Sequence, residues 1–162
     1  MIIKQKEPNM TNYIITQQDK ELVLRYLSMA LLSGVKCKHF DDSYAYTLLG
    51  IDGDVLHIDC PVYDEGDGYY EVDYCKPYLR PISSMTTDEE YEYHQIRKRN
   101  SDKSLGLMDS NDHLQQLLFP ITVGTESIVW LLNNHFDIFG LISKGLAIEV
   151  TEENNPYNIT EE

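Results

Sequence analysis

The chain has 162 residues, of which 42% are hydrophobic and 25% are charged, and this composition fits one globular domain and excludes a disordered chain. Twenty-seven Asp and Glu against thirteen Lys and Arg give a formal charge of -14 at pH 7. Such a charge opposes direct binding to nucleic acid or to an anionic membrane. No run approaches the roughly 18 apolar residues of a membrane span, and the first residues lack the apolar core of a signal peptide, so we expect a soluble, unexported chain.

The first half of the chain predicts one helix and three strands. Thr16 followed by Asp19 is a variant of the capping box and indicates that a helix begins there. Apolar residues recur at helical spacing after it, and Gly34 is placed to end the helix in a left-handed conformation. Residues 44–51 and 54–60 are rich in strand-forming residues around Asp52-Gly53, which indicates a hairpin. Residues 69–75 then give the third strand of an antiparallel meander.

The second half predicts further helices and one more strand. Pro77 and Pro81 exclude a regular central strand over 76–82. Thr86 or Thr87 is placed to cap a helix over 87–99, and the polar residues 100–112 indicate a loop. The remaining expected elements are a short helix at 113–118, a helix from 124 or 125 to 134 or 135, and a strand at 146–150.

These elements predict an α+β fold, a small antiparallel sheet packed against an N-terminal helix and two or three further helices. The apolar face of a meander must be covered, and the amphipathic helices carry the only apolar stripes left to cover it. We expect residues 1–15 to be a flexible extension, 16–150 a single domain and 151–162 a frayed acidic tail.

The chemistry-bearing residues form no catalytic motif. The cysteines Cys37, Cys60 and Cys75 form no Cys-x-x-Cys pair, and strand alternation turns His57 away from Cys60, so buried structural thiols are favoured over a nucleophile. Glu90 and His94 share a helix face, but a surface pair is favoured over a metal site. Phosphate-binding glycine loops are absent. The sequence therefore predicts no catalytic residue, no metal and no cofactor.

The strongest candidate for a binding site is acidic. Residues 41–92 hold fourteen acidic and two basic side chains, interleaved with tyrosines. Because residues two apart on a strand project from the same face, Glu71 and Asp73 form a row of like charge. The predicted contact surface, suited to a partner with a basic groove, consists of Asp52, Asp54, Asp59, Asp64, Glu65, Asp67, Glu71 and Asp73. The alternative is that these carboxylates only keep an exposed sheet edge soluble.

Two segments, 76–86 (KPYLRPISSMT) and 130–137 (WLLNNHFD), continued by 140–142 and 144–147, carry a resemblance. They resemble uncharacterised small proteins encoded by phages and mobile elements of gut bacteria. The resemblance covers the second half of the chain and brings no catalytic residues with it. It implies a setting, namely a phage or prophage protein in the bacterial cytoplasm.

Charge and setting together favour a non-enzymatic acidic module that engages, and can inhibit, a host protein of defence or of nucleic-acid handling. The expected partner is a host protein with a basic surface. Two alternatives stay open. One is a protein that sequesters a small molecule or nucleotide signal, with Tyr78 and Arg80 as ligand-binding residues. The other is a small hydrolase that uses His57, His94, His113 or His135 with neighbouring carboxylates.

Overall fold

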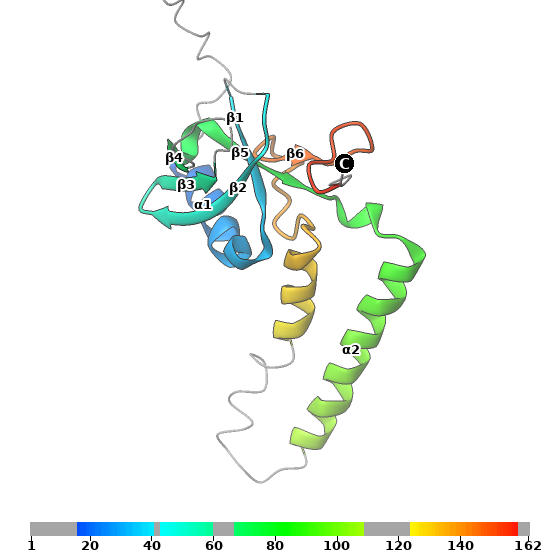
Figure 1. Ribbon diagram of the computed structural model, residues 1–162. Coiled ribbons are helices and arrows are strands. Elements are labelled where there is room, and N and C mark those ends of the chain that lie inside the picture. The colour runs from blue at the N-terminus through cyan, green and yellow to red at the C-terminus, as the bar shows by residue number, and fades with distance from the viewer. Residues whose placement is uncertain (1–15, 41–42, 60–66, 109–123, 159–162) are drawn as a thin grey trace, which may run out of the picture.

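The computed structural model describes residues 16–40, 43–59, 67–108 and 124–158, and its centre is a six-stranded sheet (Figure 1). The strand order is β4-β3-β2-β1-β5-β6, and all neighbours are antiparallel except β5 and β6. The strands are β1 (Lys36–His39), β2 (Tyr46–Asp52), β3 (Val55–Asp59), β4 (Asp67–Glu71), β5 (Cys75–Leu79) and β6 (Ile148–Glu149). The predicted α+β class is confirmed, with a sheet larger than expected.

Helix α1 (Gln17–Ala30) covers one face of this sheet. It begins as predicted, because the Thr16 hydroxyl accepts a hydrogen bond from the backbone N–H of Asp19 at 3.1 Å. The short 3₁₀ helix η2 (Leu31–Ser33) continues it, and Gly34 closes the turn with a φ of 69°. The face of α1 turned to the sheet buries Val23, Tyr26, Leu27 and Ala30.

Strands β2, β3 and β4 form the predicted meander, with the first turn at Gly53, whose φ is 59°. The third strand nevertheless ends at Glu71, four residues earlier than expected, and η3 (Val72–Tyr74) follows it. The next strand, β5, pairs with β1 and not with β3, so the chain must leave the meander at this point.

Strand β5 corrects the expectation that Pro77 excludes a central strand. The Phe40 N–H donates to the Tyr74 carbonyl at 3.0 Å, so the hydrogen-bonded pairs of β1 and β5 alternate from there, and the Cys37–Pro77 pair falls between two of them. The Pro77 nitrogen therefore points away from β1. On the other side, pairing with β6 starts only at Tyr78, so no ladder bond is lost.

Two helices extend from the same side of the sheet (Figure 1). After η4 (Ile82–Ser84), Thr86 caps α2 (Thr87–Met108), and a second helix spans 124–133. The prediction of a loop over 100–112 is wrong as far as Met108, because α2 continues to that residue. Asn100 of this helix is buried, and its amide lies 3.5 Å from the Ser127 hydroxyl of the second helix. The expected helix at 113–118 lies outside the described residues.

Candidate binding surface

The side of the sheet opposite α1, called the outer face below, carries the candidate site. Leu56 and Ile58 of β3 point into the core under α1, so the residues between and beside them point to the opposite side. The strand registers place their cross-strand partners on the same side. The meander part of the outer face thus consists of Thr47, Asp52, Val55, His57, Asp59, Tyr69 and Glu71.

Three of the predicted contact acids lie exposed on the outer face: Asp52, Asp59 and Glu71. Asp59 is directly opposite Asp67 in the β3–β4 register. Asp64 and Glu65 lie outside the described residues.

Asp54 and Asp73 are not part of this set, because both bind Lys20 of α1. The Lys20 ammonium lies 3.1 Å from Asp54 and 2.7 Å from Asp73. Hydrogen bonds to Asp73 and to Asp54 raise the pKa of Lys20. No sequence pattern indicates this contact, since Lys20 is distant from both carboxylates along the chain. Two of the predicted contact residues therefore tie α1 to the hairpin and to η3.

An aromatic pair lies between the exposed acids. The rings of His57 and Tyr69 stack at 4.7 Å between centroids and 7° between planes. Tyr69 is still 71% exposed, so one side of its ring faces solvent. A bulge in β2 places both Leu49 and Gly50 opposite His57, and Leu49 is also exposed. The meander part of the outer face therefore combines carboxylates with an exposed aromatic ring.

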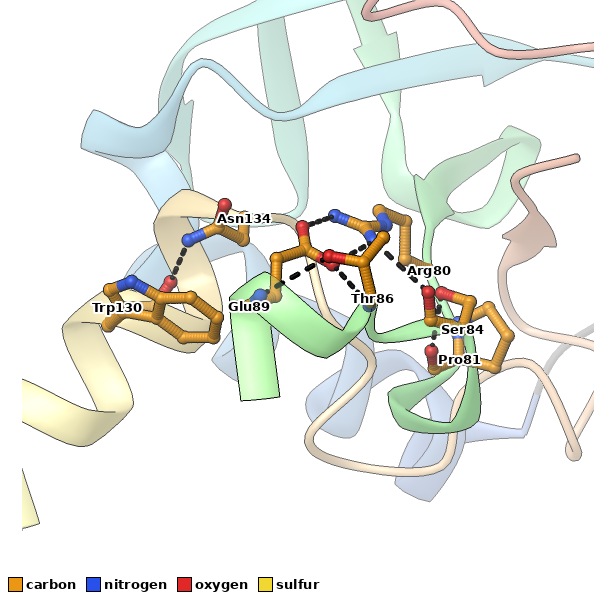
Figure 2. A network of polar contacts seen from close by, with 7 residues as sticks. All are labelled: Arg80, Pro81, Ser84, Thr86, Glu89, Trp130 and Asn134. Atoms are coloured by element: carbon orange, nitrogen blue, oxygen red, sulfur yellow. Dashed lines mark hydrogen bonds and ion pairs between the residues drawn. The ribbon is translucent and has the colours of Figure 1, made fainter. Parts of the chain in front are cut away.

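Arg80, the predicted ligand-binding cation, is held by other residues of the chain (Figure 2). Its guanidinium binds both carboxylate oxygens of Glu89, at 2.7 and 2.8 Å, and lies 4.4 Å from the centre of the Phe136 ring. Glu89 also accepts from the Thr86 N–H at 2.8 Å, as the acid of a capping box. The bonds from Arg80 and Thr86 outweigh burial and lower the pKa of Glu89 to about 2.

Tyr78, the other residue of that alternative, is buried beside the end of the described chain. The Tyr157 hydroxyl accepts from the Lys36 N–H at 3.1 Å and donates to the Tyr78 carbonyl at 2.8 Å. The hydroxyl thus takes the place of one direct backbone hydrogen bond between β1 and β5. Residues 151–158, for which the sequence suggested a frayed tail, turn back so that Tyr157 stacks on His135 at 3.7 Å. Burial, Arg80 and Lys36 lower the pKa of His135 to about 4.

The remaining candidates for chemistry are spread apart. Burial raises the pKa of the Cys37 thiol well above its usual value and that of Cys75 to about 12, which makes both poor nucleophiles. Cys60 and His113 lie outside the described ranges. Within the ranges, no three His, Cys, Asp or Glu side chains gather closely enough to hold a metal ion. Nor does any described helix combine the length and the apolar character that crossing a bilayer requires.

Two hollows lie away from the outer face. One, of about 400 Å³, lies between α2 and the helix at 124–133; Ile96, Val129 and Trp130 form its apolar lining, and Glu92, Arg99 and Glu126 are the charged residues around it. The other, of about 300 Å³, lies beside α1 and is lined mainly by polar residues, among them Arg25 and Lys144. The sequence did not predict either.

Comparison with protein-family models, with curated proteins and with solved structures finds no match to this chain.

Proposed function

We propose that this protein is a binding module that engages a basic surface of another protein through the outer face of its sheet. The observation that carries the proposal is the exposed Tyr69 ring, which lies on one sheet face with the exposed carboxylates of Asp52, Asp59 and Glu71. Aromatic rings supply apolar contact area in protein interfaces, and carboxylates match lysine and arginine in a partner.

The charge of these three carboxylates is available to a partner. In the described part of the chain, none of the three takes part in an ion pair, whereas Asp54, Asp73 and Glu89 all do. Exposed charges act over a distance of about 8 Å at physiological ionic strength. We therefore expect binding that weakens steeply as salt is added.

The kind of partner follows from the resemblance to phage-encoded proteins. In that setting the partner is a host protein of defence or nucleic-acid handling, in the bacterial cytoplasm, whose basic surface normally binds phosphates. A protein of this kind acts by occupying the surface and needs no reaction chemistry of its own.

The test compares two variants that lose the same number of charges. The first carries Asp52→Asn, Asp59→Asn and Glu71→Gln, and the matched control carries Glu90→Gln, Glu152→Gln and Glu153→Gln at exposed positions elsewhere. Both variants and the unchanged protein are used to capture partners from a bacterial lysate, and the affinity for each captured partner is then measured over a range of salt concentrations.

We expect the first variant to bind about three- to a hundredfold more weakly than the control, since exposed ion pairs contribute about 0.2–1 kcal/mol each and three are lost. We also expect its salt dependence to be shallower. Equal affinity of the two variants for the captured partner would refute the proposal, and the outer-face carboxylates would then serve only to keep the sheet soluble.

A further inference from the structure

The hydrogen-bond pattern of β4 shows which of its backbone groups face outward. The Val72 N–H donates to the Asp54 carbonyl at 2.8 Å, and Val72 and Asp54 continue the β3–β4 register. In an antiparallel ladder, bonded and non-bonded pairs alternate, so Tyr70 and Gly68 also bond to β3. The pairs Glu71–Val55 and Tyr69–His57 fall between them. The backbone groups of Tyr69 and the N–H of Glu71 therefore point away from β3.

These outward groups lie on an open edge. Strand β4 is the last strand of the sheet on this side, and no described strand pairs with its outer edge. The two residues that present the backbone groups are also exposed, Tyr69 by 71%. Unpaired N–H and C=O groups at a sheet edge form a template for an added strand. Here the template and the exposed side chains belong to the same residues.

The acidic side chains on this edge determine which kind of strand can pair with β4. If a second copy of this chain paired antiparallel about Tyr69, Glu71 of each copy would lie opposite Asp67 of the other, and like charges directly opposite are unfavourable. An added strand with Lys or Arg at those two positions would instead form two attractive pairs. The arrangement therefore disfavours self-pairing at β4 and favours a basic strand.

We propose that β4 receives an extended segment of the partner protein as a seventh strand, and this proposal rests on the function proposed above. The segment has an aromatic or apolar residue opposite Tyr69 and Lys or Arg two residues to either side. The residues in between lie on the side of α1, opposite Gly68 and Tyr70, and are apolar. Affinity comes from the main-chain bonds to Tyr69 and Glu71, and specificity from the alternate basic residues.

The test uses a synthetic peptide with the order Lys-Val-Tyr-Val-Lys between polar flanks, and two control peptides. One control has the same composition with the two lysines adjacent, and the other has an N-methyl group on the amide of its central Tyr. Binding is measured by fluorescence anisotropy, and hydrogen exchange follows the amides of Tyr69 and Glu71. We expect the first peptide to bind about fivefold more tightly than the N-methylated control, since one net hydrogen bond contributes about 1 kcal/mol. We also expect it to bind more tightly than the control with adjacent lysines, which cannot form both charge pairs.

Two variants at one position add a test on the protein. Tyr69→Pro removes the outward N–H without breaking the ladder to β3, because proline is tolerated on an edge strand when its nitrogen faces solvent. Tyr69→Val removes the same aromatic ring but keeps the N–H. We expect the peptide to bind Tyr69→Val at least about fivefold more tightly than Tyr69→Pro, and to slow exchange at Glu71 in the unchanged protein.

The possible failures are distinguishable. If the peptide binds in a salt-dependent way, but N-methylation has no effect and the amides of Tyr69 and Glu71 are not protected, strand addition is refuted and the acidic binding module stands. If none of the three peptides binds, strand addition is refuted as well. The proposed acidic binding module is then tested separately by the variant that replaces Asp52, Asp59 and Glu71. The peptide arm needs no variant to fold.

Discussion

Replacing Glu89 by Gln should destabilise the protein by about 2–3 kcal/mol at neutral pH. Glu89 is the only described partner of the Arg80 guanidinium among acidic side chains, and both side chains are 22% exposed. The pKa of Glu89 is lowered from 4.5 to about 2, chiefly by the hydrogen bonds from Arg80. Since one pKa unit corresponds to about 1.36 kcal/mol, this lowering sets an upper limit of about 3 kcal/mol.

The pH dependence of this loss of stability follows from the lowered pKa of Glu89. A carboxyl group whose pKa is lowered by folding stabilises the fold above its unfolded pKa and loses that contribution as the pH falls toward the folded value. The difference in the free energy of unfolding between the unchanged protein and Glu89→Gln should therefore be constant above pH 5 and shrink between about pH 4.5 and pH 2. Urea unfolding across this range measures it, and groups unaffected by the substitution cancel in the difference. A difference below about 0.5 kcal/mol at pH 7, or one that does not change with pH, would refute the reasoning.

Three further predictions concern contacts away from Glu89. Tyr157→Phe leaves the Lys36 N–H and the Tyr78 carbonyl without their partner and should lower the urea-unfolding free energy by about 1–3 kcal/mol, whereas Tyr44→Phe, on an exposed side chain, should change it by less than about 0.5 kcal/mol. His135→Asn, which suits the left-handed φ of 60°, should remove a loss of stability that the unchanged protein shows as the pH falls from 6.5 to about 4, because the unfolded chain takes up the proton first. The same dependence of the unfolding free energy on pH in the variant would contradict this prediction. Lys20→Met leaves Asp54 and Asp73 to repel each other and should lower the free energy of unfolding by about 1 kcal/mol at low salt and by less at high salt. An equal loss of stability in the exposed control Lys144→Met would show that the contact is not stabilising.

The parts of the fold that the sequence predicts correctly are those set by local chemistry. Thr16 and Asp19 cap α1 because their own side chains and backbone make the contact. Gly53 marks the hairpin because a tight turn needs a left-handed φ there. Strand β1 and the strand that contains Pro77 were missed, since each is defined by partners far along the chain. A proline is compatible with a central strand when its nitrogen falls on a non-bonded position, which depends on the register.

Strand alternation predicts which side chains share a face of the candidate surface, but not which of them bind other parts of the chain. Strand alternation correctly placed His57 and Asp59 on one side of β3 and Ile58 on the other. It could not separate the carboxylates that remain exposed from Asp54 and Asp73, because Lys20 approaches them only once α1 has packed on the sheet. In the same way, the sequence suggested Arg80 as a ligand-binding residue. Its pairing with Glu89 depends on how η4 turns the chain into α2.

The burial of Val72 links the core to the proposed contact at β4. Val72 is fully buried and bonds to Asp54 across the hairpin end, and this bond sets the phase of the β3–β4 ladder. A slip of one residue would turn Tyr69 into the core and Tyr70 outward, because the faces of a strand alternate. It would also exchange the backbone groups that face the open edge. Val72, a buried apolar residue, thus determines that the exposed Tyr69 ring and the outward backbone groups of β4 belong to the same positions.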